Sequence, residues 1–273
     1  MIESVLVATD GSEASSAAER FAIALASRLH LRLRGVTVIE EHLIQGMHVP
    51  GLGVAPPPLD GLEGYLKARA DAIVRRLGER ARAAQVEIQC EVLSGRADDR
   101  IVEASKGVDL LVLGRDGQHA AFRTGLPGST LDAVLRKVSR PVITVPSGAE
   151  LGGGLLLAFD GSPGSVLAGQ LAVEFGTRLH ENVSVFVDSK DKGRAAARFE
   201  EVRRLLGPLA SPGRETSSTL GRPDVKIVEA ARLAHSGLIV MGAHARNRIT
   251  EYFLGSNAAA VVRTSPVAVL LAR

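Results

Sequence analysis

Short apolar runs alternate along the chain with longer stretches in which apolar residues recur every three or four positions. The runs Val5–Ala8 and Leu110–Leu113 contain no polar residue, which is typical of strands buried on both faces of a sheet. Phe21, Leu25 and Leu29 have the spacing of one helix face. The pattern of the first half predicts strands at Ser4–Thr9, Leu31–Ile39, Val86–Leu93, Leu110–Leu113 and Val142–Val145, and helices near Ser12–Leu29, Leu62–Ala84, Ala97–Lys106 and Ser129–Val138. Such alternation predicts an α/β fold with a parallel sheet between helices.

The pattern repeats within the chain. The segment VLVATDGS at residues 5–12 recurs as LLLAFDGS at residues 155–162, and RLH at 28–30 recurs as RLH at 178–180. Later landmarks keep their order, but the second copy is shorter, mostly because it lacks a counterpart of His42–Gly64. That segment is rich in glycine and proline, so we expect a surface loop there.

A flexible linker separates the two copies at Ser147–Gly154, where glycine and serine predominate. The sequence therefore predicts two domains, at residues 1–147 and 153–273. Each is expected to be a doubly wound, Rossmann-like domain with an open parallel five-stranded sheet. Ligand-binding residues of such domains follow the carboxyl ends of the strands, beside the point where the strand order reverses.

Composition narrows the functional classes. The net charge of the 273-residue chain is only +3, aromatic residues make up 3% and tryptophan is absent, which leaves few surfaces on which nucleic-acid bases could stack. No apolar run approaches the roughly 18 residues of a membrane span. Cys90 is the only cysteine, so no intramolecular disulfide is possible. We expect a cytoplasmic protein with neither nucleic acid nor membrane as partner.

An aspartate follows the first strand of each copy. The segment Ala8-Thr9-Asp10 leads into Gly11-Ser12, and Asp160 holds the same place in the second copy. Gly11 and Ser12 are interpreted as a capped turn at a helix start. A carboxylate at this edge can accept a hydrogen bond from a base amine or a hydroxyl, so the repeat predicts ligand contacts at Ala8, Thr9, Asp10 and Asp160.

Glycines and hydroxyls follow the fourth strand of each copy. The first copy has Gly114, Arg115 and Gly117, and then, ten residues later, Gly128, Ser129 and Thr130 at a predicted helix start. Glycines let main-chain N–H groups approach an anion, and a helix start adds unpaired N–H groups. The second copy has Gly242, an alanine (Ala245) in place of the second glycine, and Gly255, Ser256 and Asn257. We expect a phosphate cradle, weaker in the second copy.

The sequence contains no motif typical of catalysis or of metal binding. Neither copy is a P-loop, because a serine stands where that motif requires lysine, and no paired base and nucleophile appears. We therefore expect binding rather than catalysis. The histidines form no closely spaced pair, so no metal site is expected. His30 and His180 are interpreted as helix-terminal residues, and Cys90 as a core residue on a buried strand.

Together the first-strand aspartate, the order of elements and the glycine motif resemble the universal stress protein family in its tandem two-domain form, over nearly the whole chain. The resemblance implies the strand order 3-2-1-4-5, with the two domains associating through Pro141–Val145 and Pro266–Leu271. It also implies ATP, with or without magnesium. Asp10 and the main chain near Val38 would hold adenosine, Gly114 would lie near the ribose, and Gly117, Gly128 and Ser129 would hold phosphates. Asp160, Gly242, Gly255 and Ser256 would act in the second domain, where Asp188 replaces Val38.

Three functions stay open on the sequence. The first is a cytoplasmic ATP-binding stress-response protein that acts as a nucleotide-dependent sensor and is not an enzyme, although slow ATP hydrolysis is compatible with the sequence. The second is a nucleotide-free dimeric interaction module, present as a homo-oligomer or as an intramolecular pseudo-dimer. The third, a nucleotide-using ligase or pyrophosphatase, is disfavoured because the loop after the first strand lacks a serine- and glycine-rich phosphate motif.

Overall fold

The computed structural model describes residues 1–40, 59–116, 129–189, 191–218, 222–243 and 254–273. The elements of the first half are β1 (Ser4–Ala8), α1 (Glu13–Leu29), β2 (Arg32–Ile39), α3 (Leu59–Ala83), β3 (Ile88–Ser94), α4 (Ala97–Ser105), β4 (Leu110–Gly114), α5 (Ser129–Lys137) and β5 (Val142–Val145). Every strand and helix predicted for this half is present, with ends shifted by a few residues.

The second half repeats this succession, as the repeated sequence predicts. Its elements are β6 (Leu155–Phe159), α6 (Pro163–Leu179), β7 (Val183–Asp188), α7 (Lys192–Leu206), a 3₁₀ turn (Gly207–Leu209), β8 (Ala210–Ser218), α8 (Pro223–Leu233), β9 (Leu238–Gly242), α9 (Ser256–Thr264) and β10 (Ala268–Ala272).

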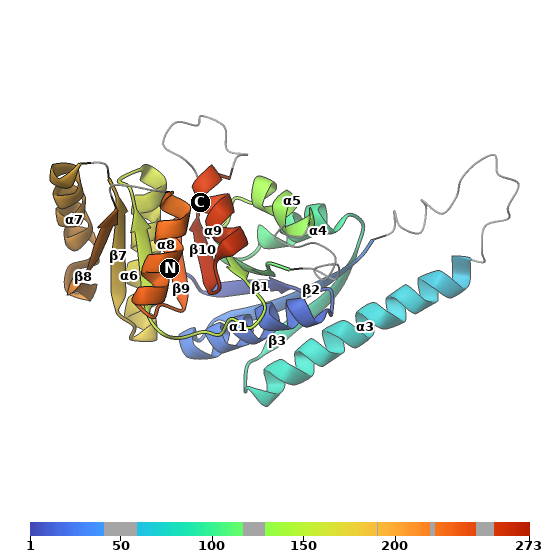
Figure 1. Ribbon diagram of the computed structural model, residues 1–273. Coiled ribbons are helices and arrows are strands. Elements are labelled where there is room, and N and C mark those ends of the chain that lie inside the picture. The colour runs from blue at the N-terminus through green and yellow to red at the C-terminus, as the bar shows by residue number, and fades with distance from the viewer. Residues whose placement is uncertain (41–58, 117–128, 190, 219–221, 244–253) are drawn as a thin grey trace, which may run out of the picture.

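All the strands form one sheet in the order β3-β2-β1-β4-β5-β10-β9-β6-β7-β8. Each half therefore has the predicted order 3-2-1-4-5, with parallel neighbours. The halves join where β10 pairs with β5 in antiparallel register, Val269 opposite Thr144. This pairing confirms the expected association through the last strands. It merges the two sheets into one, so that the two halves form an intramolecular pseudo-dimer (Figure 1).

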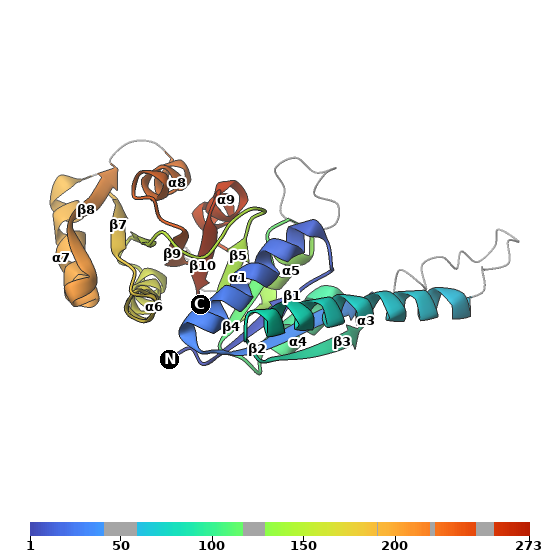
Figure 2. The same ribbon diagram turned by 90° about the horizontal axis from the view of Figure 1, so that it is seen from below.

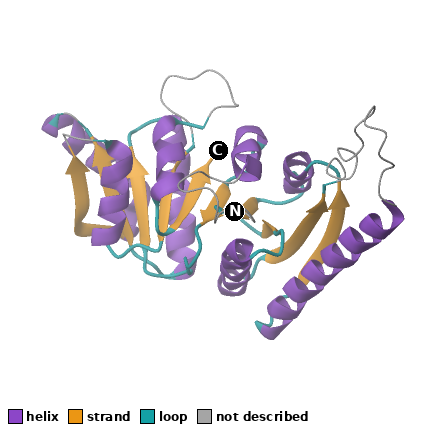
Figure 3. Ribbon diagram, turned by 45° about the vertical axis from the view of Figure 1, so that its right-hand side comes forward, coloured by secondary structure: helices purple, strands orange, loops and turns teal. Residues whose placement is uncertain are grey.

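Helices cover both faces of the sheet, as Figure 3 shows. Strand residues alternate between two hydrophobic cores: Val5 and Val7 belong to one, Leu6 and Ala8 to the other. The first core contains buried residues of α1, α3, α6 and α7, and the second contains buried residues of α4, α5, α8 and α9. All five residues of β1 are buried, in agreement with the uninterrupted apolar run Val5–Ala8.

Two repeated arginines link the halves near the C-terminal ends of α1 and α6. Arg28 donates from Nη2 to the carbonyl oxygen of Leu179 at 2.8 Å, and Arg178 donates to the carbonyl oxygen of Leu29. His30 and His180 end the two helices in left-handed conformations, with φ of 52° and 56°, which confirms their interpretation as helix-terminal residues. An arginine of each helix thus donates a hydrogen bond to a carbonyl oxygen at the C-terminal end of the other helix.

Two predictions about the outer part of the first half are wrong. Cys90 is exposed rather than a core residue, because β3 is the outermost strand and most of its residues are not fully covered. The predicted loop His42–Gly64 gives way to helix at Leu59, since glycine costs a helix only about 1 kcal/mol per residue. The remainder of that segment, residues 41–58, lies outside the described residues. Figures 1 and 2 show the N-terminal half of α3 extending past the sheet edge.

Candidate functional site

The strand order reverses between β1 and β4 in the first half and between β6 and β9 in the second. Ala8 pairs with Leu113 and with Val36, so Thr9 and Asp10 leave the sheet beside Gly114 on one side and Val38 on the other. Ala158 pairs with Met241 and Phe186 in the same manner. Asp10 and Gly114 of the first half, and Asp160 and Gly242 of the second, therefore follow neighbouring strands at one edge of the sheet, where doubly wound folds bind ligands.

Asp10 closes a tight turn at this edge. Its Oδ1 accepts a hydrogen bond from the Ser12 amide at 2.9 Å, and Gly11 adopts the left-handed φ of +74°. Ser12 then caps α1, its hydroxyl oxygen accepting from the Ser15 amide at 3.1 Å. These contacts confirm the capped turn at Gly11 and Ser12, and they orient the Asp10 carboxyl group.

The turn of the second half has the same construction. Asp160 Oδ1 accepts from the Ser162 amide at 2.9 Å, Gly161 has a φ of +73°, and Ser162 caps α6. The pairing of Phe159 with Val187 sets Asp188 beside Asp160, as Val38 stands beside Asp10. The second half thus has an acidic residue, Asp188, at the strand position that Val38 holds in the first half.

Gly114 and Gly242 have a packing role that sequence reasoning missed. A Cβ on Gly114 would lie 3.4 Å from Ser15 Cα and from the Ala14 carbonyl oxygen. A Cβ on Gly242 would lie 2.7 Å from the Gly164 carbonyl carbon. The end of the fourth strand therefore approaches the first turn of the first helix in both halves, and the approach is close enough to require glycine at Gly242 whether or not a ligand binds.

Arg115 lies between the halves. Its guanidinium donates to both carboxylate oxygens of Asp116, at 3.1 and 3.2 Å, and to the Ser265 carbonyl oxygen of the second half at 2.7 Å. The phosphate contact expected for this side chain stays a prediction, while the structure shows it bridging the two halves. The reason for this bridge is that Ser265 ends α9, whose terminal carbonyls attract a cation.

Helices α5 and α9 begin at the residues for which the sequence predicts phosphate contacts. Ser129 and Thr130 begin α5, whereas Gly117 and Gly128 lie outside the described residues. In the second half, Gly255 is the N-cap of α9 and donates to the Ala243 carbonyl oxygen at 2.8 Å, and Ser256 and Asn257 are exposed on the first turn. First-turn amides lack partners within their helix and can face an anion.

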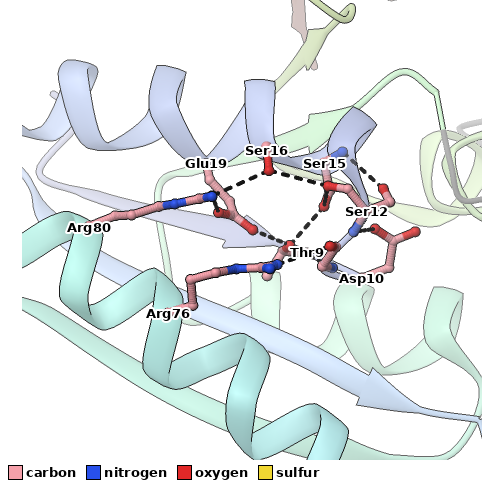
Figure 4. Close-up of polar contacts among 9 residues, drawn as sticks. Thr9, Asp10, Ser12, Ser15, Ser16, Glu19, Arg76 and Arg80 are labelled. Carbon is pink, nitrogen blue, oxygen red and sulfur yellow. Dashed lines mark hydrogen bonds and ion pairs between the residues drawn. The ribbon is translucent and has the colours of Figure 1, made fainter.

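A buried polar network lies behind the Asp10 turn, and sequence reasoning did not find it (Figure 4). Thr9 Oγ1 donates to Glu19 Oε1 at 2.5 Å and accepts from the Gly11 amide at 3.1 Å. Glu19 is fully buried, and Arg80 of α3 donates to its other oxygen. The only sequence signal was a charged residue set among the apolar positions of α1.

The network also reaches the turn from outside. Arg76, one helical turn before Arg80 on α3, donates from Nη2 to the Gly11 carbonyl oxygen at 2.9 Å.

The second half has apolar packing in place of this network. Phe159 stands where Thr9 would be and Gly169 where Glu19 would be, and Leu205 of α7 fills the space of the missing side chain, 2.2 Å from a Cβ built on Gly169.

Metal binding and membrane insertion find no support among the described residues. No group of three or more His, Cys, Asp or Glu side chains lies close enough to hold a metal ion among the residues described. Of the helices described, none combines the length and the apolar character that a membrane span requires.

Comparison with known proteins agrees with this architecture. The model of the universal stress protein family matches residues 1–146 and 155–273. The chain belongs to the universal stress protein family, in its tandem form.

A universal stress protein of Synechocystis sp. is 24% identical over the full length of both chains. One of Mycobacterium tuberculosis is 25% identical over 98% of this chain and 94% of its own. The crystal structure of a universal stress protein from Archaeoglobus fulgidus superposes with a TM-score of 0.80 at 19% identity, covering 99% of this chain and 98% of that one. The structural likeness establishes the fold.

Proposed function

We propose that the protein is a cytoplasmic stress-response protein that binds ATP, with or without magnesium, in the crevice of its first domain and more weakly in that of its second. Nucleotide occupancy would alter domain packing or partner binding without catalysis, with residues 1–147 and 153–273 as the two domains. The observation that carries this proposal is the repeated aspartate, Asp10 and Asp160, at the reversal point of each half of the sheet.

The donor and acceptor groups of the first crevice fit the two ends of a nucleotide. Asp10 offers a carboxylate beside Val38, suited to hydroxyl and base-amine donors. On the opposite side α5 begins with Ser129 and Thr130, whose hydroxyls and first-turn amides suit phosphate. Gly117 and Gly128 would complete this end, with Gly114 near the ribose. Contacts of these kinds are sufficient for micromolar affinity, about −8 kcal/mol.

The second crevice is proposed as the weaker site. It retains Asp160, Gly242, Gly255, Ser256 and Asn257 in the matching places. Asp188 adds a second acidic residue at the adenosine end, and Ala245 replaces the second glycine of the motif. We expect a dissociation constant for ATP at least tenfold higher than that of the first crevice.

Titration calorimetry with ATP tests the proposal. Wild-type protein should give saturable heat, and Gly117→Ala with Gly128→Asp should abolish the tighter phase by distorting the loop and repelling phosphate. Gly64→Asp is the matched charge control, because a Cβ there would meet no atom within 4 Å and it lies on the exposed part of α3. Absence of saturable heat in the wild type would contradict the proposal.

One observation favours a second candidate, the nucleotide-free interaction module. Arg115 is occupied by Asp116 and Ser265, and the last strands already pair within the chain, so the halves are held together without a ligand. This candidate predicts that mass spectrometry of gently purified protein finds no nucleotide and that assembly survives the Gly128→Asp substitution. Co-purified ATP in a stoichiometric amount would exclude it.

A further inference from the structure

The backbone on both sides of Gly11 is held by side chains that belong to one connected network. The Gly11 amide donates to Thr9 Oγ1 at 3.1 Å, and the Gly11 carbonyl oxygen accepts from Arg76 at 2.9 Å. Gly11 directly follows Asp10, whose carboxyl oxygen accepts from the Ser12 amide. Whatever moves Thr9 or Arg76 therefore displaces the peptide groups that carry and orient the Asp10 carboxylate.

The network is anchored in the protein interior. Thr9 donates to Glu19 Oε1 at 2.5 Å, and Thr9 Oγ1 also lies 2.9 Å from Ser15 Oγ. The Glu19 side chain is 1% exposed and pairs with Arg80. A buried carboxylate requires its partners, because an unpaired charge in the interior is costly. This requirement ties the position of Thr9 to the position of Arg80, and so to helix α3.

Helix α3 thus contacts the Asp10 turn at two levels. Arg80 reaches the buried carboxylate and Arg76, four residues earlier, reaches the turn itself. Figure 4 shows both side chains extending from α3 towards α1 and the turn. We propose that Thr9, Glu19, Arg76 and Arg80 are positioning residues of the first crevice, which make its affinity for nucleotide depend on the docking of α3. The inference rests on the proposed function and deepens it.

The second half supplies the internal comparison. Phe159 has no hydroxyl to accept from the Gly161 amide, and Gly169 has no carboxylate. Arg198 of α7 lies against Gly161, with Nη1 1.4 Å from a Cβ built there, but it pairs with Glu201 of its own helix at 2.9 Å. The Asp160 turn therefore lacks the buried carboxylate to which the first turn is tied.

The test uses the full chain and conservative variants. Thr9→Val removes the hydroxyl and keeps the shape, Thr9→Ser restores the hydroxyl, and Arg76→Ala removes the contact with Gly11. Arg75→Ala is the matched control, because Arg75 is an exposed arginine on the same helix. Amide hydrogen exchange of residues 9–16 is followed without ligand. ATP affinity is measured in an Asp160→Ala background, so that the heat reports the first crevice.

Thr9→Val should speed exchange of the Gly11 amide about tenfold, the effect of losing one buried hydrogen bond. Thr9→Val and Arg76→Ala should each raise the dissociation constant for ATP about three- to tenfold. Thr9→Ser and Arg75→Ala should stay within twofold of the background protein, and the melting temperature of Arg76→Ala should match that of Arg75→Ala. Rescue by serine separates the hydroxyl from a general effect on packing.

The outcomes distinguish this inference from the proposed function. If the background protein binds ATP and Thr9→Val binds it equally well, the positioning role is wrong and the proposed function stands. Unchanged exchange at Gly11 in Thr9→Val also overturns the positioning role, without any nucleotide present. A wild-type protein that binds no ATP overturns the proposed function, and with it the link from α3 to affinity.

Discussion

Behind the turn that carries Asp10 the first half buries the carboxylate of Glu19, and behind the turn that carries Asp160 the second half packs the partly buried Leu205. The two turns are alike in their aspartate bond, in the left-handed glycine and in the capping serine. Their interiors differ because Thr9 and Glu19 correspond to Phe159 and Gly169. The same backbone can therefore be supported by a polar network or by apolar packing, and the polar solution adds a defined link to a neighbouring helix.

Removal of Arg80 should produce the largest difference between the halves. Arg80→Leu leaves Glu19 buried without its cationic partner, which should reduce the free energy of unfolding by about 3 kcal/mol, the lower end of the range for broken buried pairs since Arg80 is partly exposed. The double variant Glu19→Leu with Arg80→Leu copies the apolar solution of the second half and should recover most of the loss. Urea denaturation measures both, and a double variant no more stable than Arg80→Leu would contradict this account.

The fold was predictable from the sequence because both of its determinants are periodic patterns. Uninterrupted apolar runs such as that of β1 indicate a doubly covered parallel strand, and the repeated segment fixes two copies of one topology. The resemblance to the family added the strand order and the pairing of the last strands, and both are confirmed.

Of the candidate site, only the two local turns could be predicted from the sequence. The sequence located the Asp10 and Asp160 turns, because aspartate, glycine and serine have strong local preferences. It did not reveal the Glu19–Arg80 pair or the place of Arg115 between the halves, because both join residues distant in sequence through side chains. Cys90 was misplaced for the related reason that periodicity does not tell an edge strand from a central one.

Adding a methyl group at the close strand–helix approach should affect the second half more than the first. In Gly242→Ala the new Cβ would lie 2.7 Å from backbone carbon of Gly164, whereas in Gly114→Ala all contacts are at 3.4 Å. Backbone atoms cannot move out of the way by changing rotamer, as a side chain can. Gly242→Ala should therefore reduce the free energy of unfolding by about 1–3 kcal/mol, and Gly114→Ala by less than about 1 kcal/mol. Thermal and urea unfolding of the two variants provide the measurement. Equal losses would show that helix α6 shifts as easily as α1.

Acid should reduce the free energy of unfolding of both halves, by less than the substitutions above. The group responsible is a carboxylate present in both copies of the repeat, Asp98 and Asp224. Burial raises the pKa of Asp98, but hydrogen bonds and charge from Lys137 and Arg96 outweigh it, so that pKa lies below its ordinary value of 3.8. The hydrogen bond from Arg222 lowers the pKa of Asp224 despite burial. A carboxyl group whose pKa falls on folding stabilises the protein above its unfolded pKa, and this contribution is lost as the pH drops through the folded value.

Substitution of these aspartates should therefore matter at neutral pH and lose its effect in acid. Asp98→Asn should reduce the free energy of unfolding by about 1 kcal/mol or less at pH 7, because Lys137 is partly exposed and solvent screens the pair. Asp224→Asn, whose partner Arg222 is more exposed, should cost less. As the pH falls from the unfolded pKa of about 3.9 through the lower folded pKa, each variant should approach the wild type, because the native carboxyl becomes protonated. Urea unfolding from pH 7 to pH 2.5 follows the difference, with Asp71→Asn on the exposed side of α3 as control. A difference that is the same at both ends of this range would mean that packing of the side chain, and not its charge, supports the α4 and α8 starts.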